Sequence, residues 1–486
     1  MAKPTPLMEH LLRRAGFGMT PAERDKWSRY PYSLAVLALT SFNPEKTDID
    51  QYIGTPGYVG ITTRGSFQPN SVINDARQRW LFRMVHSPAP LQEKMAFFWH
   101  HHFATAQSKI AGILGSSADA TRTMAAKPQS DPAGAKGQIE LFREMALPKF
   151  RDLLVAVAKD VAMLYWLDGY LNRRGQPQEN FGRELMELFT FGVENYIETD
   201  VYAAARVFTG WNLVSTGTRG TPQGYWAFNY NANQHDTGVK EFSFAIYPDG
   251  SHRIEARSAA QGMQDGIDLI NALAIHPETA RRLARRLWVW FVSETDAPDA
   301  DFVNQIADTY LKSDTDMRVV VRAVLLSSHF TNPSRYYQRY SWPGEFVARA
   351  MKEVGHIGFS VDTAIPAMLN MGQQLFEPPD VNGWDLGPSW FTTGGMLARM
   401  NFASQLAQNQ RFALRDAARS SAGTPESLVT FVTERLSLPQ LSGGERGTLT
   451  DYVRAGGAWT ASDAQILNKA GGLAHLLTGS GEYQFV

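Results

Sequence analysis

The sequence contains no cysteine in its 486 residues. This absence excludes disulfide bonds, thiolate zinc sites, cysteine-ligated iron–sulfur clusters and a cysteine nucleophile. It leaves the cellular compartment open, because a protein without cysteine tolerates both reducing and oxidising surroundings. A transition-metal site in this chain would therefore use imidazole and carboxylate ligands.

The sequence also lacks an excess of charge of one sign. It has 47 Lys and Arg against 48 Asp and Glu, which gives a formal net charge of −1. No global field draws such a protein to nucleic acid or to an anionic membrane, so we expect no nucleic-acid partner. A hydrophobic content of 44% and a charged content of 20% are typical of a folded soluble protein rather than a disordered one.

Long hydrophobic runs are absent as well. The nearest approach to a membrane span, residues 153–164, is interrupted by Lys159 and Asp160, so we expect no span. Residues 1–6 lack the apolar stretch of a secretory signal. We therefore expect a soluble chain that is either cytoplasmic or exported with its leader removed, and the sequence does not decide between the two.

The stretch between Pro177 and Gly192 is the focus of the sequence. Pro177 suits the first turn of a helix, where its missing N–H costs nothing, and Gly192 suits a left-handed C-terminal cap. On a helical wheel, apolar and polar residues separate onto opposite arcs. The apolar arc holds Phe181, Leu185, Leu188 and Phe189, and the polar arc holds Asn180, Arg183, Glu184 and Glu187. Further apolar residues border the polar arc, which is typical of a buried helix.

This polar arc has two interpretations. Two carboxylates, an amide and a guanidinium in a buried place must satisfy one another, bind a cation or take part in chemistry. In the structural interpretation, Arg183 pairs with Glu187 at i,i+4 and Asn180 caps a turn. In the functional interpretation, Glu184 and Glu187 are catalytic groups and Arg183 supports them. The helix alone does not decide between the two.

A second polar motif is the run of three histidines at residues 100–102, which lies between aromatic residues. His100 and His102 are two residues apart and point to different sides of a regular helix. They converge on one ion only if the helix ends or tightens there. In the structural interpretation, one histidine packs, one caps the last turn and one faces water.

A third motif lies in the only part of the chain with a strand-like pattern. Residues 225–230 alternate aromatic and polar side chains, and we expect a small β region over residues 225–253. It carries the sequence His235-Asp236-Thr237-Gly238, which places an imidazole and a carboxylate together at an exposed bend between two short strands. In the structural interpretation, Asp236 only closes an Asx turn.

Most of the remaining sequence has helical periodicity, so we predict a mainly α fold with more than half of its residues in helices. We expect a single large helical domain over residues 1–486 with a flexible insertion at about 116–137. Residues 371–395, which are rich in aromatics, prolines and glycines, predict an irregular loop that walls a pocket. The arginine run at 281–286 predicts a solvated or salt-bridged face.

Taken together, these landmarks resemble a bacterial family catalogued as domain of unknown function 1800. The matching segments are residues 11–18 (Leu-Leu-Arg-Arg-Ala-Gly-Phe-Gly), 98–103 (Phe-Trp-His-His-His-Phe), 179–188 (Glu-Asn-Phe-Gly-Arg-Glu-Leu-Met-Glu-Leu), 205–211 (Ala-Arg-Val-Phe-Thr-Gly-Trp), 235–240 (His-Asp-Thr-Gly-Val-Lys) and 372–384. They occur in the family's order and cover nearly the whole chain. The chain departs from the family pattern at His101 and at Gln178, where the pattern has asparagine. The resemblance implies that members are often exported, and it implies positions rather than a reaction.

Our leading hypothesis is an enzyme with one or two divalent metal ions, Zn, Mn or Fe, held between helices. The predicted ligands are His100, His102, Glu184 and His235. Glu187 or Asp236 would act as general base or further ligand, and Arg183 would bind an anion or support a ligand. Metal-assisted hydrolysis is the first reaction class and oxidation at iron the second. The predicted substrate-binding residues are Asn180, Trp211, Lys240 and Trp384.

Two other hypotheses remain open. In a metal-free glycoside hydrolase, Glu184 or Glu187 would act as the acid with Asp236 or Asp168 across a cleft, on a saccharide stacked against tryptophan. In a non-enzymatic scaffold, the polar motifs would form a buried network, and the helical body would bind an exported protein or a polymer. The expected partner is accordingly an unknown small molecule, a polysaccharide or an exported protein.

Overall fold

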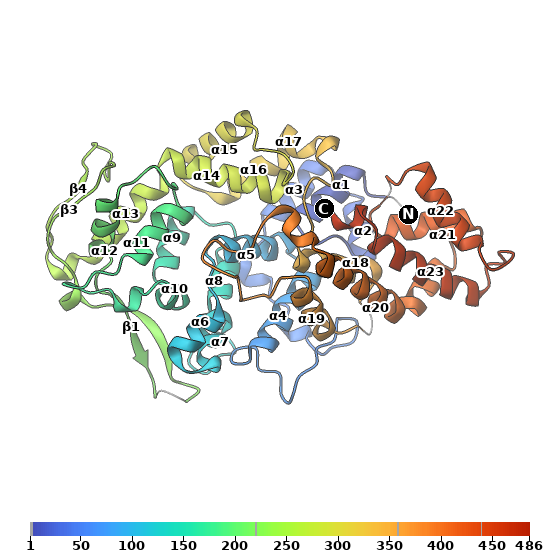
Figure 1. Ribbon diagram of the computed structural model, residues 1–486, viewed down its shortest axis with the longest axis horizontal. Coiled ribbons are helices and arrows are strands. Elements are labelled where there is room, and N and C mark those ends of the chain that lie inside the picture. Colours follow the sequence, from blue (N-terminus) through green and yellow to red (C-terminus); the bar gives the residue numbers. More distant parts are fainter. Residues whose placement is uncertain (1–2, 219–220, 357–358, 439) are drawn as a thin grey trace.

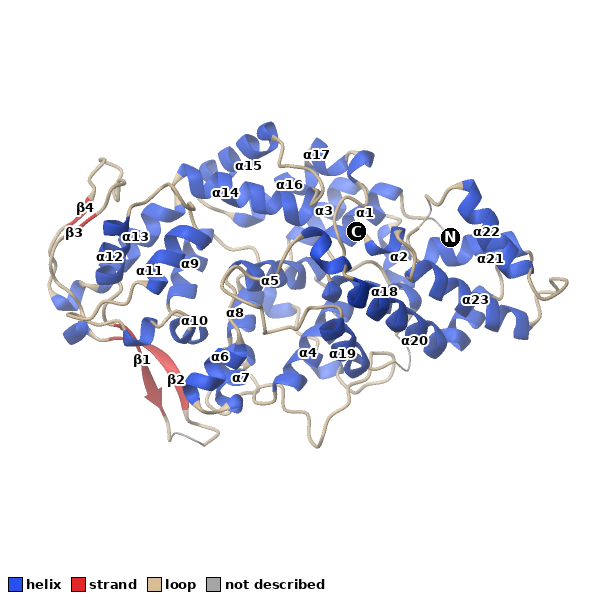
Figure 2. Cartoon of the chain, in the orientation of Figure 1, coloured by secondary structure: helices blue, strands red, loops and turns tan. Residues whose placement is uncertain are grey.

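Helices make up 58% of the chain in the computed structural model, which describes residues 3–218, 221–356, 359–438 and 440–486. Figure 2 shows helices along the whole molecule and the strands gathered at one end. The prediction of a mainly α fold with one small β region is confirmed.

The helices follow one another in three groups along the chain (Figure 1). The first group comprises α1 (Pro6–Arg14), α2 (Pro21–Trp27), α3 (Tyr32–Thr40), α4 (Ile73–His86), α5 (Pro90–His102), α6 (Gln107–Leu114), α7 (Ser117–Ala125) and α8 (Gln138–Glu144). The second comprises α9 (Phe150–Ala158), α10 (Val161–Trp166), α11 (Asn180–Glu184), α12 (Glu198–Val207), α13 (Met263–Ala274), α14 (Pro277–Leu287), α15 (Ala300–Lys312), α16 (Met317–Leu326) and α17 (Ser328–Thr331). The third comprises α18 (Pro343–Val354), α19 (Val361–Asn370), α20 (Thr393–Ala418), α21 (Pro425–Arg435), α22 (Gly443–Arg454) and α23 (Asp463–Thr478). Helices α9–α13 and the strands lie at the left end of Figure 1, α5 lies near its centre, and α21–α23 lie at its right end.

The strands form two small antiparallel sheets. Strand β1 (Trp211–Thr216) pairs with β2 (Tyr225–Tyr230), and β3 (Lys240–Glu241) pairs with β4 (Arg253–Ile254). Strand β1 lies before the predicted β region, and the sequence pattern did not indicate it. Its start depends on Gly210, whose φ is 82° and where an added Cβ would lie 2.6 Å from the carbonyl oxygen of Asn231. Only glycine fits this sharp turn without strain, so α12 passes directly into a strand.

The segment that the sequence predicts as a flexible insertion, residues 116–137, is partly helical. Helix α7 occupies Ser117–Ala125, and the side chain of Ser116 caps its first turn. The guanidinium of Arg122 holds the following loop through two bonds to the Asp131 carboxylate, with Nε–Oδ2 at 2.8 Å and Nη2–Oδ1 at 2.5 Å. Small residues of this helix pack closely in the interior, because Ala120, Thr121, Thr123 and Ala125 are buried.

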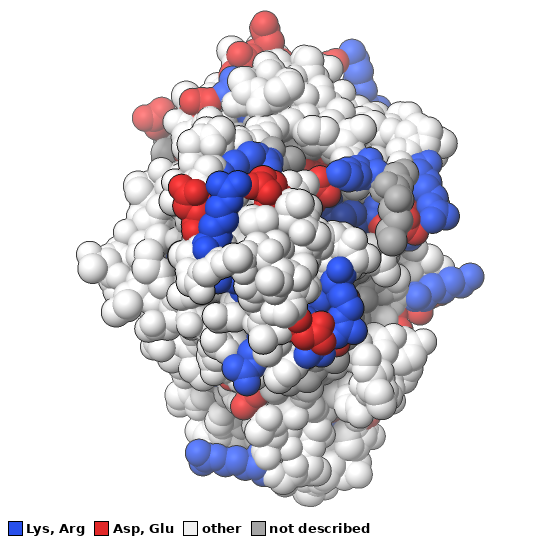
Figure 3. Space-filling view, turned by 90° about the vertical axis from the view of Figure 1, so that its right-hand side faces the viewer, with Lys and Arg blue, Asp and Glu red and all other residues white. Residues whose placement is uncertain are grey.

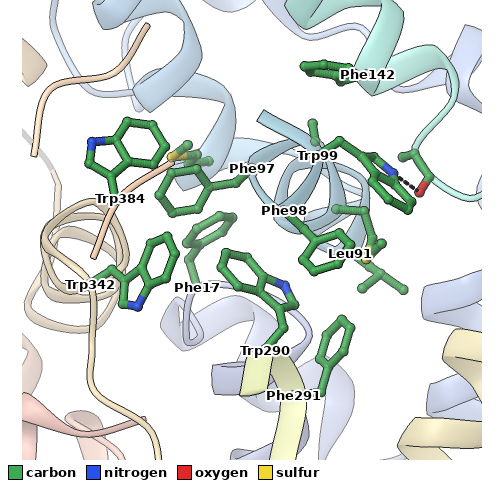
Figure 4. Close-up of a cluster of buried hydrophobic side chains, with 14 of the residues drawn as sticks. Phe17, Leu91, Phe97, Phe98, Trp99, Phe142, Trp290, Phe291, Trp342 and Trp384 are labelled. Carbon is green, nitrogen blue, oxygen red and sulfur yellow. Dashed lines mark hydrogen bonds between the residues drawn. The ribbon is translucent and has the colours of Figure 1, made fainter. Parts of the chain in front are cut away.

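The core is centred on the aromatic side chains of α5 and its neighbours (Figure 4). The rings of Phe97, Trp290 and Trp342 meet edge to face, with centroids between 5.1 and 5.7 Å apart, a favourable geometry for aromatic pairs. Trp99 points to the other side of α5, where its Nε1 donates to the carbonyl of Ala146 (3.0 Å). One connected cluster of buried apolar side chains extends from the first helix to the C-terminal segment, and the single-domain boundary over 1–486 stays a prediction.

A buried ion cluster lies against these rings. Nη1 of Arg339 donates to both carboxylate oxygens of Glu345, at 2.7 and 2.5 Å, and Lys94 forms an ion pair with the same carboxylate. The Arg339 guanidinium also lies 4.5 Å from the centroid of Trp290. Burial opposes the ionisation of Glu345, but the two cations outweigh it and lower its pKa to about 2.

Other buried arginines donate to backbone carbonyls of distant segments. Arg14 on α1 donates to the carbonyls of Val292 and Arg335, each at 3.1 Å. Arg399 on α20 donates to the carbonyl of Ser341 at 2.8 Å. These bonds satisfy carbonyl groups that would otherwise be buried without a partner.

The surface carries charges of both signs close together. Figure 3 views the end of the molecule formed by α21–α23, where basic and acidic side chains alternate on a largely uncharged face. Among the residues that the structure describes, no helix combines the length and apolar character needed to cross a bilayer.

The buried ion cluster generates a stability prediction. Replacing Glu345 by glutamine keeps the side-chain shape but leaves Lys94 without its counter-charge and Arg339 with only the more distant Glu294, at 3.8 Å. We expect the free energy of unfolding to fall by about 3–5 kcal/mol, measured by urea denaturation at pH 7. Because the folded pKa of Glu345 lies below its ordinary value of 4.5, its contribution is present above pH 4.5 and is lost as the pH falls towards 2.

The matched control is Asp308→Asn, which removes the partner of Lys312 in an exposed i,i+4 pair. Such pairs contribute about 0–1 kcal/mol. Equal losses of stability in the two variants would contradict a special role for the buried cluster.

Candidate functional site

The focal segment begins as an α-helix and continues as a wider turn. Helix α11 (Asn180–Glu184) runs into a π-helical turn over Leu185–Phe189. The sequence predicts one regular helix from Pro177, so the observed helix starts later and is wider in its second half. Gly192 adopts the predicted left-handed conformation, with φ at 89°. π-Helical turns are rare and are often found at functional sites.

The polar arc of this segment is paired differently from the structural interpretation. Arg183 forms ion pairs with Glu198 (2.6 Å) and Glu179 (3.5 Å) and not with Glu187. Glu187 instead accepts a hydrogen bond from the hydroxyl of Tyr196. Arg183 is therefore already neutralised by carboxylates on the surface side of the segment.

Asn180 lies at the exposed start of the segment. Its Nδ2 donates to Oδ2 of Asp168 at 2.8 Å, and Asp168 itself holds a left-handed backbone conformation with φ at 60°. The amide that the sequence assigns to substrate binding thus holds the turn at Asp168, the carboxylate that the glycosidase hypothesis assigns to acid–base chemistry.

Glu184 differs from its neighbours because its carboxylate has neither a hydrogen bond nor an ion pair among the described residues. The side chain is half-buried. Partial burial and the nearby charge of Glu187 raise the pKa of Glu184, whereas Arg183 lowers it by a smaller amount. A partly buried carboxyl group with a raised pKa is a candidate for proton transfer.

The three consecutive histidines end α5, and all of them are buried. The ring of His100 meets the rings of Trp80 and Trp384 edge to face, with centroids 5.4 and 5.3 Å away. Its Nε2 has no hydrogen-bond partner among the described residues. Burial lowers the pKa of His100 to about 3, so its ring is neutral at physiological pH.

His101 and His102 contact two different elements and are fixed in one tautomer. Nε2 of His102 donates to the carbonyl of Phe189 at 3.1 Å, and Nδ1 of His101 accepts from the backbone N–H of Trp384 at 3.2 Å. Both rings therefore carry their proton on Nε2. Burial, together with the nearby Arg286, holds the pKa of both histidines well below the ordinary value. They act as neutral hydrogen-bonding groups.

Two arginines of α14 lie beside these histidines, and we call Arg282 and Arg286 the arginine pair. Both side chains are half-buried, and neither forms an ion pair with a carboxylate among the described residues. Nη2 of Arg282 makes one long hydrogen bond to the carbonyl of Leu188 (3.4 Å), and its Nε is buried without a partner. Burial and the charge of Arg282 lower the pKa of Arg286 to about 9, so both remain cations at neutral pH.

The predicted solvated or salt-bridged face is therefore found for only half of the arginine run. Arg281 pairs with Glu278, and Arg285 is exposed, whereas the arginine pair turns inward. Positions 282 and 286 share one stripe of the helix because they are four residues apart. The sequence signal that we missed is the count of charges: α14 has four arginines and a single acidic residue.

The arginine pair and the focal segment together form the candidate functional site. Its members are Glu184, Glu187, Tyr196, Arg282 and Arg286, with His101 and His102 behind them. Four parts of the chain supply these groups, namely the focal segment, the loop before α12 that carries Tyr196, α14 and the C-terminal end of α5 (Figure 1). The site thus combines two guanidinium groups, two carboxylates, a phenol and two neutral imidazoles.

The His235–Asp236 bend forms a separate network in which the polar groups bond one another. His235 is fully buried, its Nδ1 lies 2.8 Å from the carbonyl of Thr209, and its Nε2 lies 3.2 Å from Oδ2 of Asp265. Lys240 is also fully buried and pairs with the same Asp265 oxygen at 2.5 Å. Two predicted site residues, a metal ligand and a substrate-binding group, are thus engaged with a carboxylate that sequence reasoning missed.

Asp236 and Trp211 are engaged in the same region. Arg206 donates to both carboxylate oxygens of Asp236, at 2.9 and 3.0 Å. The N–H of Gly238 donates to Asp236 Oδ1 at 2.9 Å, which is the Asx turn of the structural interpretation. Trp211 is 1% exposed and is packed against Phe208, so its ring offers no open surface for a substrate.

Trp384 belongs to the irregular segment 371–395 and packs on the histidine run. Gly383 precedes it with φ at 88°, and an added Cβ there would lie 2.3 Å from Nδ1 of His101. This contact admits only glycine and seats the loop on α5. Trp384 and Trp390 line a hollow of about 340 Å³.

The predicted metal ligands do not gather around one point. Throughout the described parts of the chain, no three His, Asp or Glu side chains are grouped closely enough to hold a metal ion. His100 is enclosed by aromatic rings, His102 bonds a backbone carbonyl, His235 bonds Asp265, and Glu184 lies beside Glu187. These residues therefore do not fit a shared divalent ion, and the bound metal stays a prediction that elemental analysis of untagged protein can test.

The His235 network generates a second prediction. Asp265→Asn removes the counter-charge of the fully buried Lys240. We expect the free energy of unfolding to fall by about 3–5 kcal/mol in urea denaturation. The double variant Asp265→Asn with Lys240→Met removes both charges and should recover part of this loss. A single variant within 1 kcal/mol of wild type would refute the structural role of this network.

One protein-family model matches nearly the whole chain, including every residue of the candidate functional site. The family described as "Protein of unknown function (DUF1800)" matches residues 10–485. Comparison with curated proteins and with solved structures gives no match. The resemblance inferred from the sequence motifs is thus confirmed, and the family description supplies no reaction. The chain belongs to the DUF1800 family of proteins of unknown function.

Proposed function

We propose that the protein binds an anionic small molecule at the arginine pair. The observation that carries this proposal is the pair of half-buried guanidinium groups, Arg282 and Arg286, without a carboxylate partner among the described residues. Two like charges four residues apart on one helix repel each other, and partial burial adds a desolvation cost. A bound anion would relieve both costs.

The arrangement of the pair favours a carboxylate, phosphate or sulfate group. A guanidinium presents paired N–H donors that match two oxygens of such an anion. In Arg282, the Nε–H donor of this planar group has no hydrogen-bond partner among the described residues. The imidazoles of His101 and His102 are neutral and do not add a competing positive charge. The charge available to the ligand therefore comes from the arginine pair itself.

The carboxylate side of the site favours a ligand that also carries a hydroxyl or another proton donor. Glu184 has unused acceptor oxygens, and Glu187 is held by the hydroxyl of Tyr196. An anion bound at the arginine pair would bring its neutral part towards these carboxylates, because Glu187 is close enough to raise the pKa of Arg282. A hydroxylated organic acid or an ester of a polyol fits this division of charge.

A second candidate function is acid–base catalysis on the bound anion, and the state of Glu184 favours it. Its pKa is raised by burial and by Glu187, and it has no structural partner to lose. A partly buried carboxyl group without a structural partner is placed to exchange a proton with a bound ligand. This candidate retains the hydrolase class of our leading hypothesis and uses no metal ion in the step.

The binding proposal is tested by single substitutions in α14. Inorganic phosphate, sulfate, acetate and citrate are titrated into wild-type protein and into Arg282→Gln and Arg286→Gln, with calorimetry and thermal shift as readouts. We expect at least one anion to raise the melting temperature of the wild type by mass action and to lose this effect in both variants. Without ligand, both variants should be as stable as the wild type or more stable, because like-charge repulsion is removed.

Arg285→Gln is the matched control, because it removes an exposed charge from the same helix. It should leave anion binding unchanged. Equal weakening in all three variants would show only a general effect of net charge, and no binding by the wild type would remove the proposal.

The acid–base candidate is tested with Glu184→Gln. We expect its unfolding free energy to stay within about 0.5 kcal/mol of wild type, because the carboxylate has neither a hydrogen bond nor an ion pair in the part of the chain that the structure describes. Hydrolysis of chromogenic phosphate, sulfate and carboxylate esters, where the wild type shows activity, should fall by about 100- to 10,000-fold. Glu179→Gln, a neighbour on the surface side, serves as control. A loss of several kcal/mol in Glu184→Gln would instead identify a structural carboxylate.

A further inference from the structure

Two hollows follow each other along α7, away from the candidate functional site. The smaller, of about 250 Å³, lies between α7 and strand β2, and the larger, of about 900 Å³, lies between α7 and the long loop before α4. Asp119 and Arg122 line both, so the two hollows adjoin. Figure 1 shows the hairpin of β1 and β2, helix α7 and this loop along the lower edge of the molecule. We call the two hollows together the α7 groove.

Aromatic side chains line both parts of the groove. Tyr225 and Trp226 of β2 line the smaller hollow, and Phe67 lines the larger. Tyr225 and Phe67 are half-buried, and the Tyr225 hydroxyl makes no hydrogen bond among the described residues. Phe67 stacks on no other ring of the described chain. Such partly exposed rings offer flat apolar faces, and Tyr225 adds a polar hydroxyl group at its edge.

The cations of the groove already have partners within the protein. Arg122 bonds Asp131 and the carbonyl of Gly224 (2.7 Å), and Lys127 pairs with Asp50 at 3.0 Å and also with Asp48. Their charge is therefore neutralised before any ligand arrives. This distinguishes the α7 groove from the arginine pair and disfavours a polyanionic ligand.

Asp119 provides an unused acceptor at the junction of the two hollows. Its backbone N–H donates to the Ser116 side chain (3.1 Å), but its carboxylate makes no hydrogen bond or ion pair among the described residues. The carboxylate is half-buried. A carboxylate in this position accepts hydrogen bonds from hydroxyl groups and repels an anion.

From these features, we infer that the α7 groove is a binding site for a neutral oligosaccharide chain. The guanidinium of Arg122 lies over one face of the Tyr225 ring, 5.6 Å from its centroid. Stacking on the other face of Tyr225 at one end and on Phe67 at the other would hold sugar rings by their apolar faces, while Asp119 accepts hydroxyl donors between them. The length of two adjoining hollows favours a chain over a single sugar. This inference is independent of the proposed anion site, with which the groove shares no residue.

The experiment measures binding of defined sugars by calorimetry. The probes are cellohexaose, xylohexaose, maltohexaose and chitohexaose, together with the corresponding trisaccharides. We expect at least one hexasaccharide to bind, and its trisaccharide to bind at least about ten-fold more weakly because it cannot span both hollows. Tyr225→Ala and Phe67→Ala should each weaken binding of the hexasaccharide about ten-fold. Asp119→Asn should weaken it without lowering stability, because its carboxylate has no partner to lose.

Tyr202→Ala is the matched control, because Tyr202 is an exposed tyrosine of α12 outside the groove. It should leave sugar affinity unchanged, and melting curves of all variants should separate loss of binding from loss of fold. The inference is overturned if no hexasaccharide binds at millimolar concentration, or if the groove variants bind as tightly as wild type. It is also overturned if trisaccharides bind as tightly as hexasaccharides, or if only a strand-forming peptide binds, which would indicate pairing with the free edge of β2.

Discussion

The fold depends on buried arginines that donate to backbone carbonyls of distant segments. Arg14 reaches a carbonyl 321 residues away in the sequence, Arg349 bonds the carbonyls of Leu436 and Phe485, and Arg399 bonds Ser341. A guanidinium has five donors in a rigid fork, so one side chain can join several chain segments at once. In a protein without cysteine, these charge-assisted bonds perform the cross-linking that disulfides perform elsewhere. The termini and the central helices are held together by the same kind of interaction.

The arginine pair differs from these buried arginines, whose guanidinium groups are bonded to backbone carbonyls. A buried cation without a partner is costly, and the other inward-facing arginines described above avoid this cost through carboxylates, carbonyls or aromatic faces. Arg282 makes one long hydrogen bond to the carbonyl of Leu188. Among the described residues, neither Arg282 nor Arg286 pairs with a carboxylate. Both side chains are half-buried. A bound anion would therefore supply the counter-charge and the hydrogen-bond acceptors that they lack. Local instability of this kind is expected at binding sites, because the ligand supplies the missing interaction.

Sequence reasoning predicted the helical architecture and the left-handed cap at Gly192, because periodicity and glycine chemistry are local. It missed strand β1, since the turn at Gly210 depends on its close approach to Asn231, a contact that only the fold creates. It also missed the role of Asp265, which lies 30 residues from His235 in the sequence and touches its ring in the structure. The inward turn of Arg282 and Arg286 was equally hidden, because the helical wheel gives relative directions but not what lies opposite each face.

The segments that resemble the family pattern mostly position the chain segments around the candidate functional site. The first motif supplies Arg14, which clamps α1 to the centre of the molecule. The histidine run carries Trp384 on one side and the end of the π-helical turn on the other, through His101 and His102. Because both imidazoles are kept neutral, they fix the position of Phe189 and its segment without opposing the guanidinium charges nearby. The histidine run thereby fixes the turn that carries Glu187 and follows Glu184 relative to α5, and Arg282 on α14 bonds the same turn through the carbonyl of Leu188.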